Sequence, residues 1–292
     1  MNSLNVYDGI YPALLTPFDS NEQINHTELK KMVKYLEKLP FKGFYVGGST
    51  GEAMLMSYEE RKSLFKTVIE NISNNSILPI AHIGAPSTIT AIDMGLYAKS
   101  LGYPIVSAVA PYYYPFKVKE IMDYYRVLSQ KIGLPFVIYN YPGASNYALN
   151  SEAVLDLFKD PNFIGIKHTS YDLFSLRNFR EVKPEISIFN GFDEVLLGGL
   201  SMGASGGIGS TYNIIPNTII GIYESFLKGD INKASSLQNK ACEMINVLIK
   251  YGVMPSEKYL LSKKDIDMGN CRRPFSKLDK EAMDKLDLLV LD

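Results

Sequence analysis

A repeated alternation of short apolar runs with longer helical segments constrains the fold of this chain more than any other feature. The runs are rich in β-branched and aromatic residues and cover 10–18, 43–48, 78–84, 105–110, 136–141, 163–169, 186–190 and 206–209. Apolar residues recur with a helical period between them, first at Leu29, Met32, Val33 and Leu36, then within 58–74, 88–101, 118–132, 151–159, 172–181, 195–202 and 215–228. The pattern amounts to about eight strand–helix units, spaced by roughly 20 to 30 residues.

This alternation predicts parallel strands, because parallel pairing needs a crossover connection between consecutive strands. Eight units are what a closed (β/α)8 barrel, or TIM barrel, requires. An open doubly wound sheet usually has a Gly-rich turn after its first strand, whereas the first run here ends in Thr16-Pro17-Phe18. We therefore expect an α/β TIM barrel over residues 1–229. Three further helical patterns in 230–292 predict a C-terminal helical extension, packed on the barrel as one structural unit.

Two helix starts are marked by capping residues. Asn25 with Glu28, and Ser57 with Glu60, have the spacing of a capping box. In such a box the first side chain caps the helix and the glutamate reaches back to the cap. We expect helices to begin directly after Asn25 and Ser57.

Composition and charge exclude several classes of function. The 292 residues are 46% hydrophobic and 21% charged, which is ordinary for a globular protein. Thirty basic and 31 acidic residues give a net charge of −1; without a basic stripe, no nucleic-acid partner is expected. No run approaches the roughly 18 apolar residues of a membrane span. Only two cysteines, and no signal-peptide pattern at the start, predict a cytoplasmic protein.

Polar residues follow five of the predicted strands at their carboxyl ends, where TIM barrels build their active sites. The segments are 47–52 (Gly-Gly-Ser-Thr-Gly-Glu), 139–142 (Tyr-Asn-Tyr-Pro), 167–170 (Lys-His-Thr-Ser), 191–194 (Gly-Phe-Asp-Glu) and 207–211 (Gly-Ile-Gly-Ser-Thr). We expect their side chains to converge on one cavity.

Lys167 is the most informative of these residues. Alternation along its strand places Gly165, Lys167 and Thr169 toward the barrel interior, and Ile164 and Ile166 toward the helices. Burial lowers the pKa of an ammonium group, and a neutral amine attacks carbonyl groups to form an imine, or Schiff base. The alternative is a structural lysine that pairs with an interior carboxylate.

Tyr139, Ser49 and Thr50 are the next candidates. Tyr139 is in phase with Val137 and should face the same cavity, where a phenol can bind a carboxylate and relay a proton. Hydroxyls and free N–H groups in the Gly-rich turn at Ser49 and Thr50 suit a carboxylate. The alternatives are a packed aromatic side chain and a simple tight turn.

The sequence gives weaker support to three other kinds of site: a metal site, a hydrolase active site and a phosphate site. The three histidines, His26, His82 and His168, lack the spacing of metal ligands, so no metal site is expected, and His168 should face the helices. Gly47-x-Ser49-x-Gly51 matches a hydrolase motif but follows only the second strand. A phosphate site at 206–210 stays open, although it lacks the Lys of a P-loop.

At these residues the sequence resembles the Schiff-base, pyruvate-dependent class I aldolases, the family that includes dihydrodipicolinate synthase and N-acetylneuraminate lyase. The similarity runs from 13–18 to 271–275, and its most specific pieces are 47–52, 139–142, 165–170 and 206–213. Ser49 and Ala144 fit the sialic acid lyase branch, since the synthases carry threonine and arginine at those positions.

The resemblance implies cleavage of the sialic acid N-acetylneuraminate to N-acetylmannosamine and pyruvate, through an imine on Lys167 and without a separate cofactor. Tyr139 would move a proton at the C4 hydroxyl. Tyr113 would complete a proton relay with Ser49, often across a subunit contact in a homotetramer. The residues implied in binding the sugar acid are Ser49, Thr50, Thr169, Gly191, Asp193, Glu194 and Ser210.

Three other functions stay open. An aldolase for a different 2-keto-3-deoxy sugar acid could share Lys167 and Tyr139. A synthase-like condensation is disfavoured by Ala144. A non-catalytic sugar-acid sensor would have no need of the intact set of Lys167, Tyr139 and Ser49.

Overall fold

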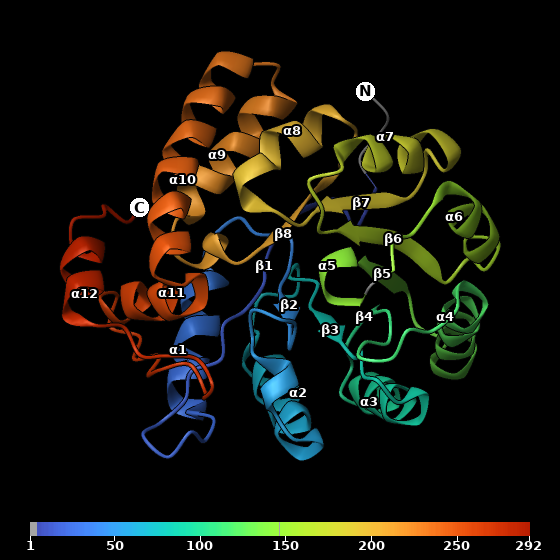
Figure 1. Cartoon of the computed structure of the whole chain (residues 1–292), viewed down its shortest axis with the longest axis horizontal. Helices are drawn as coiled ribbons and strands as arrows, with labels where there is room; N and C mark the ends of the chain where they lie inside the picture. Colours follow the sequence, from blue (N-terminus) through green and yellow to red (C-terminus); the bar gives the residue numbers. More distant parts are fainter. Residues whose placement is uncertain (1–4, 146) are drawn as a thin grey trace.

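Eight parallel strands form the wall of a barrel, and helices surround it (Figure 1). The computed structural model describes residues 5–145 and 147–292. The strands are β1 (Gly9–Pro12), β2 (Tyr45–Val46), β3 (Ile80–His82), β4 (Ile105–Val109), β5 (Phe136–Asn140), β6 (Phe163–His168), β7 (Ser187–Asn190) and β8 (Gly206–Gly209). From β2 to β8 the strands pair in chain order, and β1 pairs with β8. The predicted TIM barrel is confirmed.

Apart from the short α5, which was not predicted, the helices occupy the predicted segments, with short 3-10 turns between some of them. They are α1 (His26–Leu36), η1 (Ala53–Leu55), α2 (Tyr58–Asn71), α3 (Thr88–Ser100), α4 (Val118–Ile132), α5 (Pro142–Ser145), α6 (Ser151–Leu157), α7 (Leu173–Val182), η2 (Asp193–Val195), α8 (Leu196–Ser201), η3 (Thr211–Asn213), α9 (Pro216–Leu227), α10 (Ile231–Tyr251), α11 (Val253–Ser262) and α12 (Lys280–Leu286). None of the described helices is long and apolar enough to cross a membrane.

The first two strands are shorter than their apolar runs predicted. β1 ends at Pro12, and in the described part of the chain a single isolated bridge, between Ala13 just after β1 and Tyr45 of β2, connects the two segments. β2 ends before Gly47, whose backbone φ of +69° is incompatible with a strand. The chain therefore leaves the barrel wall early at both points, and residues 47–52 form a loop over its carboxyl end.

The two predicted helix caps differ in outcome. Ser57 and Glu60 form a full capping box at α2, with N–H to oxygen distances of 2.7 and 3.3 Å. Asn25 caps α1 by accepting from the Glu28 N–H, but the box predicted there is wrong. The Glu28 carboxylate instead accepts from the Asp267 N–H at 2.9 Å. The Glu28 carboxylate, which the local spacing assigned to the helix cap, therefore binds a backbone N–H from a distant part of the chain.

Two apolar layers make the core. One fills the barrel and includes Tyr11, Tyr45, Val137, Tyr139 and Phe189, and the other lies between strands and helices. Ile166 belongs to the outer layer, as predicted. Ile164 packs against the inner layer, which contradicts the prediction. A register shift between Phe136 and Val137 opposite this part of β6 inserts one residue and resets the alternation.

The C-terminal helices α10, α11 and α12 gather on one side of the barrel, next to α1 (Figure 1). Gln238 of α10 ties the first of them to the barrel: it accepts from the Leu197 N–H and donates to the Asp193 carbonyl, at 2.9 and 3.1 Å. The long α10 thereby reaches the loop after β7. This contact brings the extension to the carboxyl ends of the strands.

Candidate active site

A cavity of about 330 Å³ opens at the carboxyl ends of the strands. Nine of the ten residues singled out in the sequence line it: Ser49, Thr50, Tyr139, Lys167, Thr169, Gly191, Asp193, Glu194 and Ser210. They come from five different strand–helix junctions. The convergence follows from the parallel barrel, which brings every strand end to the same face.

Lys167 stands inside the barrel, where it is only 5% exposed. Its Nζ lies over the rings of Tyr45 and Tyr139, 4.3 and 4.2 Å from their centroids. Burial lowers the pKa of this amine to about 7, and the negative charge of Asp193 partly opposes the shift. A substantial fraction of Lys167 is therefore neutral near pH 7, which is the nucleophilic form.

Tyr139 shares the cavity floor with Lys167, as its phase predicted. Burial raises its pKa to about 12, while the hydroxyls of Thr169 and Ser49 partly offset that rise. The phenol therefore holds its proton at neutral pH and can donate a hydrogen bond. Any proton that it passes on must be replaced from these neighbouring hydroxyls or from a bound molecule.

The loop that carries Ser49 and Thr50 is fixed from both sides. On the barrel side, His82 of β3 contacts the Gly47 carbonyl through Nδ1 at 3.0 Å. On the other side, the buried Glu52 accepts from the Arg272 N–H at 2.8 Å and pairs with Lys258 at 2.5 Å. Glu52 has a backbone φ of +57°, which a non-glycine residue adopts only when its surroundings hold it there.

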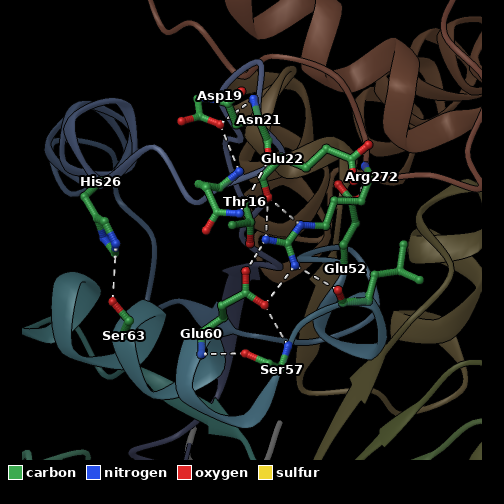
Figure 2. A network of polar contacts seen from close by, with 12 residues as sticks. Thr16, Asp19, Asn21, Glu22, His26, Glu52, Ser57, Glu60, Ser63 and Arg272 are labelled. Carbon is green, nitrogen blue, oxygen red and sulfur yellow. Dashed lines mark hydrogen bonds and ion pairs between the residues drawn. The ribbon is translucent and has the colours of Figure 1, made fainter.

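The Arg272 side chain makes a further set of contacts beside the loop that carries Ser49 and Thr50. Its guanidinium donates to the Glu22 and Leu55 carbonyls, at 2.5 to 2.9 Å, and also pairs with Glu60 at the start of α2. Figure 2 shows the Arg272 side chain between Glu22, Glu52 and Glu60. These contacts all join Arg272 of the C-terminal extension to residues of the barrel, so they fix the two parts of the chain to each other.

Asp193 is buried against the start of η3. One carboxylate oxygen accepts from both the N–H and the hydroxyl of Thr211, at 2.9 and 2.7 Å, and the other has no hydrogen-bond partner in the described structure. Burial raises the pKa of Asp193 to about 6 despite these bonds. A Cβ at Gly209 would stand 1.7 Å from the Asp193 carboxylate, so only glycine fits there.

Glu194 and the aromatic residues beside it form the outer wall. Its carboxylate accepts from the Tyr171 hydroxyl at 2.6 Å, and the Tyr171 ring stacks on Phe192 with centroids 4.5 Å apart. A Cβ at Gly191 would lie 2.0 Å from the Thr169 hydroxyl. The Glu194 carboxylate therefore lies at the edge of the cavity, where it can accept hydrogen bonds from polar groups of a ligand.

Sequence reasoning missed one wall of the cavity. Ile245 and Ile249 of α10 and Val253 of α11 line it opposite the strand ends. Their apolar periodicity indicated only a packed helix. Nothing in the local sequence showed that this helix face would cover a cavity.

Tyr113 is the one predicted site residue that the single chain does not bring to the cavity. It is 84% exposed and does not contact Lys167 or Ser49. Its backbone φ of +84° is unusual for a tyrosine. A role in the proton relay therefore requires a second copy of the chain.

The His168 ring lies behind the cavity rather than in its lining, as predicted, and makes two hydrogen bonds there. The Asn140 side-chain amide donates to Nδ1 at 2.8 Å, and Nε2 donates to the Asp172 carbonyl at 3.0 Å. Burial lowers the pKa of His168, so the ring is neutral and connects β5 with the start of α7. Within residues 5–145 and 147–292, no three His, Cys, Asp or Glu side chains are grouped to hold a metal ion.

This arrangement can carry out one kind of chemistry well. A neutral amine and a phenol share the floor of a cavity, hydroxyls lie on one side, and carboxylates lie on the other. The amine can attack a ketone, the hydroxyls and N–H groups of residues 49–50 can bind a carboxylate, and the far wall can bind hydroxyl groups.

Comparisons with known proteins agree with this geometry. The model of the dihydrodipicolinate synthetase family matches residues 6–291. An N-acetylneuraminate lyase of Rhizobium meliloti (strain 1021) is 41% identical over 273 residues, which cover 94% of this chain and 91% of that protein. The structure of N-acetylneuraminate lyase from Fusobacterium nucleatum aligns with a TM-score of 0.92 and 33% identity over 97% of both chains. A catalytic lysine mutant of Ruminococcus gnavus sialic acid aldolase aligns with a TM-score of 0.94 and 28% identity, over 98% of this chain and 95% of that one.

Proposed function

Because this chain belongs to the dihydrodipicolinate synthetase family, we propose that it is a carbon–carbon lyase that cleaves N-acetylneuraminate to N-acetylmannosamine and pyruvate. The relatives named above carry that activity or that substrate in their names. The observation that carries the proposal is the buried Lys167, whose lowered pKa of about 7 leaves a substantial fraction of the amine neutral near pH 7, on the floor of a cavity that the family's polar residues surround.

The reaction begins with attack of the neutral Lys167 amine on the C2 ketone of the open-chain sugar acid. Loss of water gives a protonated imine. The C3–C4 bond then breaks as the C4 hydroxyl loses its proton, and the bonding electron pair moves into the imine to form an enamine. Protonation at C3 and hydrolysis release pyruvate and regenerate the amine. The other product leaves as N-acetylmannosamine.

Tyr139 is the group that moves the proton at the C4 hydroxyl. Its phenol is protonated at neutral pH, so it accepts the proton as it passes its own to a neighbour. Ser49 is the neighbour that the sequence motif offers for this relay. Tyr113 of a second copy completes the relay in the homotetramer that the family resemblance implies.

The remaining site residues bind and orient the substrate. Ser49 and Thr50 hold the carboxylate next to C2. Thr169, Gly191, Asp193, Glu194 and Ser210 line the other side of the cavity and orient the polyol chain. No separate cofactor takes part in these steps, because the imine on Lys167 accepts the electron pair. The cytoplasmic location stays a prediction from cysteine content.

Turnover of N-acetylneuraminate, measured against 2-keto-3-deoxygluconate, tests the substrate. We expect a clear preference for N-acetylneuraminate, and equal rates or the opposite preference would instead support the aldolase for another sugar acid. Borohydride added with pyruvate should reduce the imine and leave a stable adduct on Lys167, which peptide mass mapping detects. No adduct on Lys167 would remove the imine mechanism and leave the sensor alternative.

A further inference from the structure

Glu257 is a buried carboxyl group that the reaction above does not use. It lies on α11, it is 0% exposed, and neither carboxyl oxygen has a hydrogen-bond partner among the described residues. The adjacent Lys258 is engaged elsewhere, because its ammonium pairs with Glu52 and donates to the Asn270 carbonyl. A buried carboxylate without a partner is strongly unfavourable, so the neutral acid is the favoured form of Glu257.

Glu257 lies one helical turn after Val253 on α11, and Val253 lines the cavity together with Ser210. The same helix packs against η3, which begins directly after Ser210, so the Glu257 side chain lies behind this part of the cavity wall. Burial raises its pKa to about 8; the nearby Ser210 hydroxyl opposes that rise, and the negative charge of Asp193 adds to it. Ser210 lines the cavity, whereas Glu257 does not. The other titratable neighbours are Cys271, whose pKa Glu257 helps to raise, and Lys258 on the same helix.

We propose that Glu257 is a positioning residue that, as a neutral acid, donates its proton to the Ser210 hydroxyl oxygen and so turns the Ser210 hydrogen toward the bound sugar acid. A serine hydroxyl has one hydrogen and two lone pairs. If Glu257 occupies a lone pair, the hydrogen stays free for the cavity. Ser210 then donates to an oxygen of the substrate, and the site prefers ligands with an acceptor at that point.

Ionisation of Glu257 reverses this arrangement. A carboxylate can only accept, so it takes the Ser210 hydrogen for itself. The hydroxyl then offers the cavity a lone pair instead of a donor. This inference rests on the proposed function, since it assigns Ser210 a contact with the sugar acid.

Glu257→Leu and Glu257→Gln separate positioning from a structural role. Leucine fills the space without a donor, so KM for N-acetylneuraminate should rise about threefold to tenfold, with kcat near the wild-type value. Glutamine keeps a neutral donor and should restore KM at pH 7. The melting temperature of the leucine variant should stay close to that of the wild type or exceed it, because an apolar side chain of similar volume replaces a buried polar one.

Ser256→Ala is the matched control. Ser256 lies on the same helix, is 0% exposed, and has a hydroxyl without a hydrogen-bond partner in the described structure. Its removal perturbs α11 equally but leaves Ser210 untouched. We expect wild-type KM and kcat.

The pH dependence of KM gives a second readout. The KM ratio of wild type to Glu257→Gln should be near one at pH 7 and rise above pH 8, because only the wild type loses its donor there. Lys167, Asp193, Cys271 and Lys258 are present in both proteins, so their titration largely cancels in the ratio.

The outcomes separate the two proposals. If the wild type does not cleave N-acetylneuraminate, the proposed function fails and this assignment fails with it. If the wild type cleaves it but the leucine variant has an unchanged KM, or glutamine is as impaired as leucine, the role of Glu257 is overturned while the function stands. If the leucine variant does not fold, a KM ratio that stays flat with pH overturns the role of Glu257, and a rising ratio supports it.

Discussion

Lys258→Met tests whether the buried Glu52–Lys258 pair holds the loop of the cavity. Both side chains are fully buried, with Nζ and Oε1 2.5 Å apart. Glu52 also accepts from the Arg272 N–H, so its carboxylate cannot turn to water when Lys258 is lost. Burial lowers the pKa of Lys258, and the charge of Glu52 works against that shift. Methionine matches the aliphatic stem of lysine but leaves the carboxylate without its cation.

Breaking a buried ion pair on one side costs about 3–5 kcal/mol. An unfolding entropy of about 2.1 cal/mol/K per residue makes each kcal/mol equivalent to roughly 1.6 °C in a chain of 292 residues. The melting temperature of Lys258→Met should therefore fall by about 5–8 °C. KM for pyruvate should also rise, because Ser49 and Thr50 precede Glu52 in the same loop.

The double variant Lys258→Met/Glu52→Gln removes both charges and should recover most of the lost stability, since the amide oxygen still accepts from Arg272. Lys280→Met is the surface control. It breaks the exposed Lys280–Asp284 pair, which is expected to contribute less than about 1 kcal/mol. Thermal and urea unfolding at one protein concentration measure all three. The reasoning is refuted if Lys258→Met costs no more than Lys280→Met, or if the double variant is less stable than the single one.

Three more predictions follow from the site. Tyr139→Phe should lower kcat for sugar-acid cleavage by roughly 10²- to 10⁴-fold while pyruvate is still trapped on Lys167; equal loss of both would make Tyr139 structural. Imine formation with pyruvate should increase as pH rises through about 7, because only the deprotonated Lys167 reacts. Asp193→Asn should move this transition to lower pH, because the negative charge of Asp193 raises the pKa of Lys167. Cyanoborohydride trapping between about pH 5.5 and 9 measures both effects. A transition that stays in place would show that Asp193 does not act on Lys167. Gly209→Ala should displace the Asp193 carboxylate, which would lie 1.7 Å from the new Cβ, and weaken sugar-acid cleavage more than pyruvate trapping; wild-type kinetics would show that the loop absorbs the methyl group.

Local patterns in the sequence were enough to predict the barrel and the floor of the site. Alternation of apolar residues located all eight strands, and the phase of Lys167 and Tyr139 placed both side chains inside. These features depend on the period of a strand or helix, which a short segment carries by itself. The Ser57–Glu60 box succeeded for the same reason.

Only the tertiary structure decided the features that join distant segments. Arg272 and Glu52, 220 residues apart, meet at the loop of the cavity, and α10 supplies a wall that its own periodicity could not reveal. The shift of the Lys167 pKa to about 7 also belongs here, because desolvation depends on everything packed around the amine. The sequence by itself determined that Lys167 and Tyr139 face the barrel interior, since alternation is a local property, whereas the orientation of Ile164 depends on the register shift between β5 and β6. Burial, charge pairing and the far wall of the cavity arise only when the closed barrel and its C-terminal helices pack together.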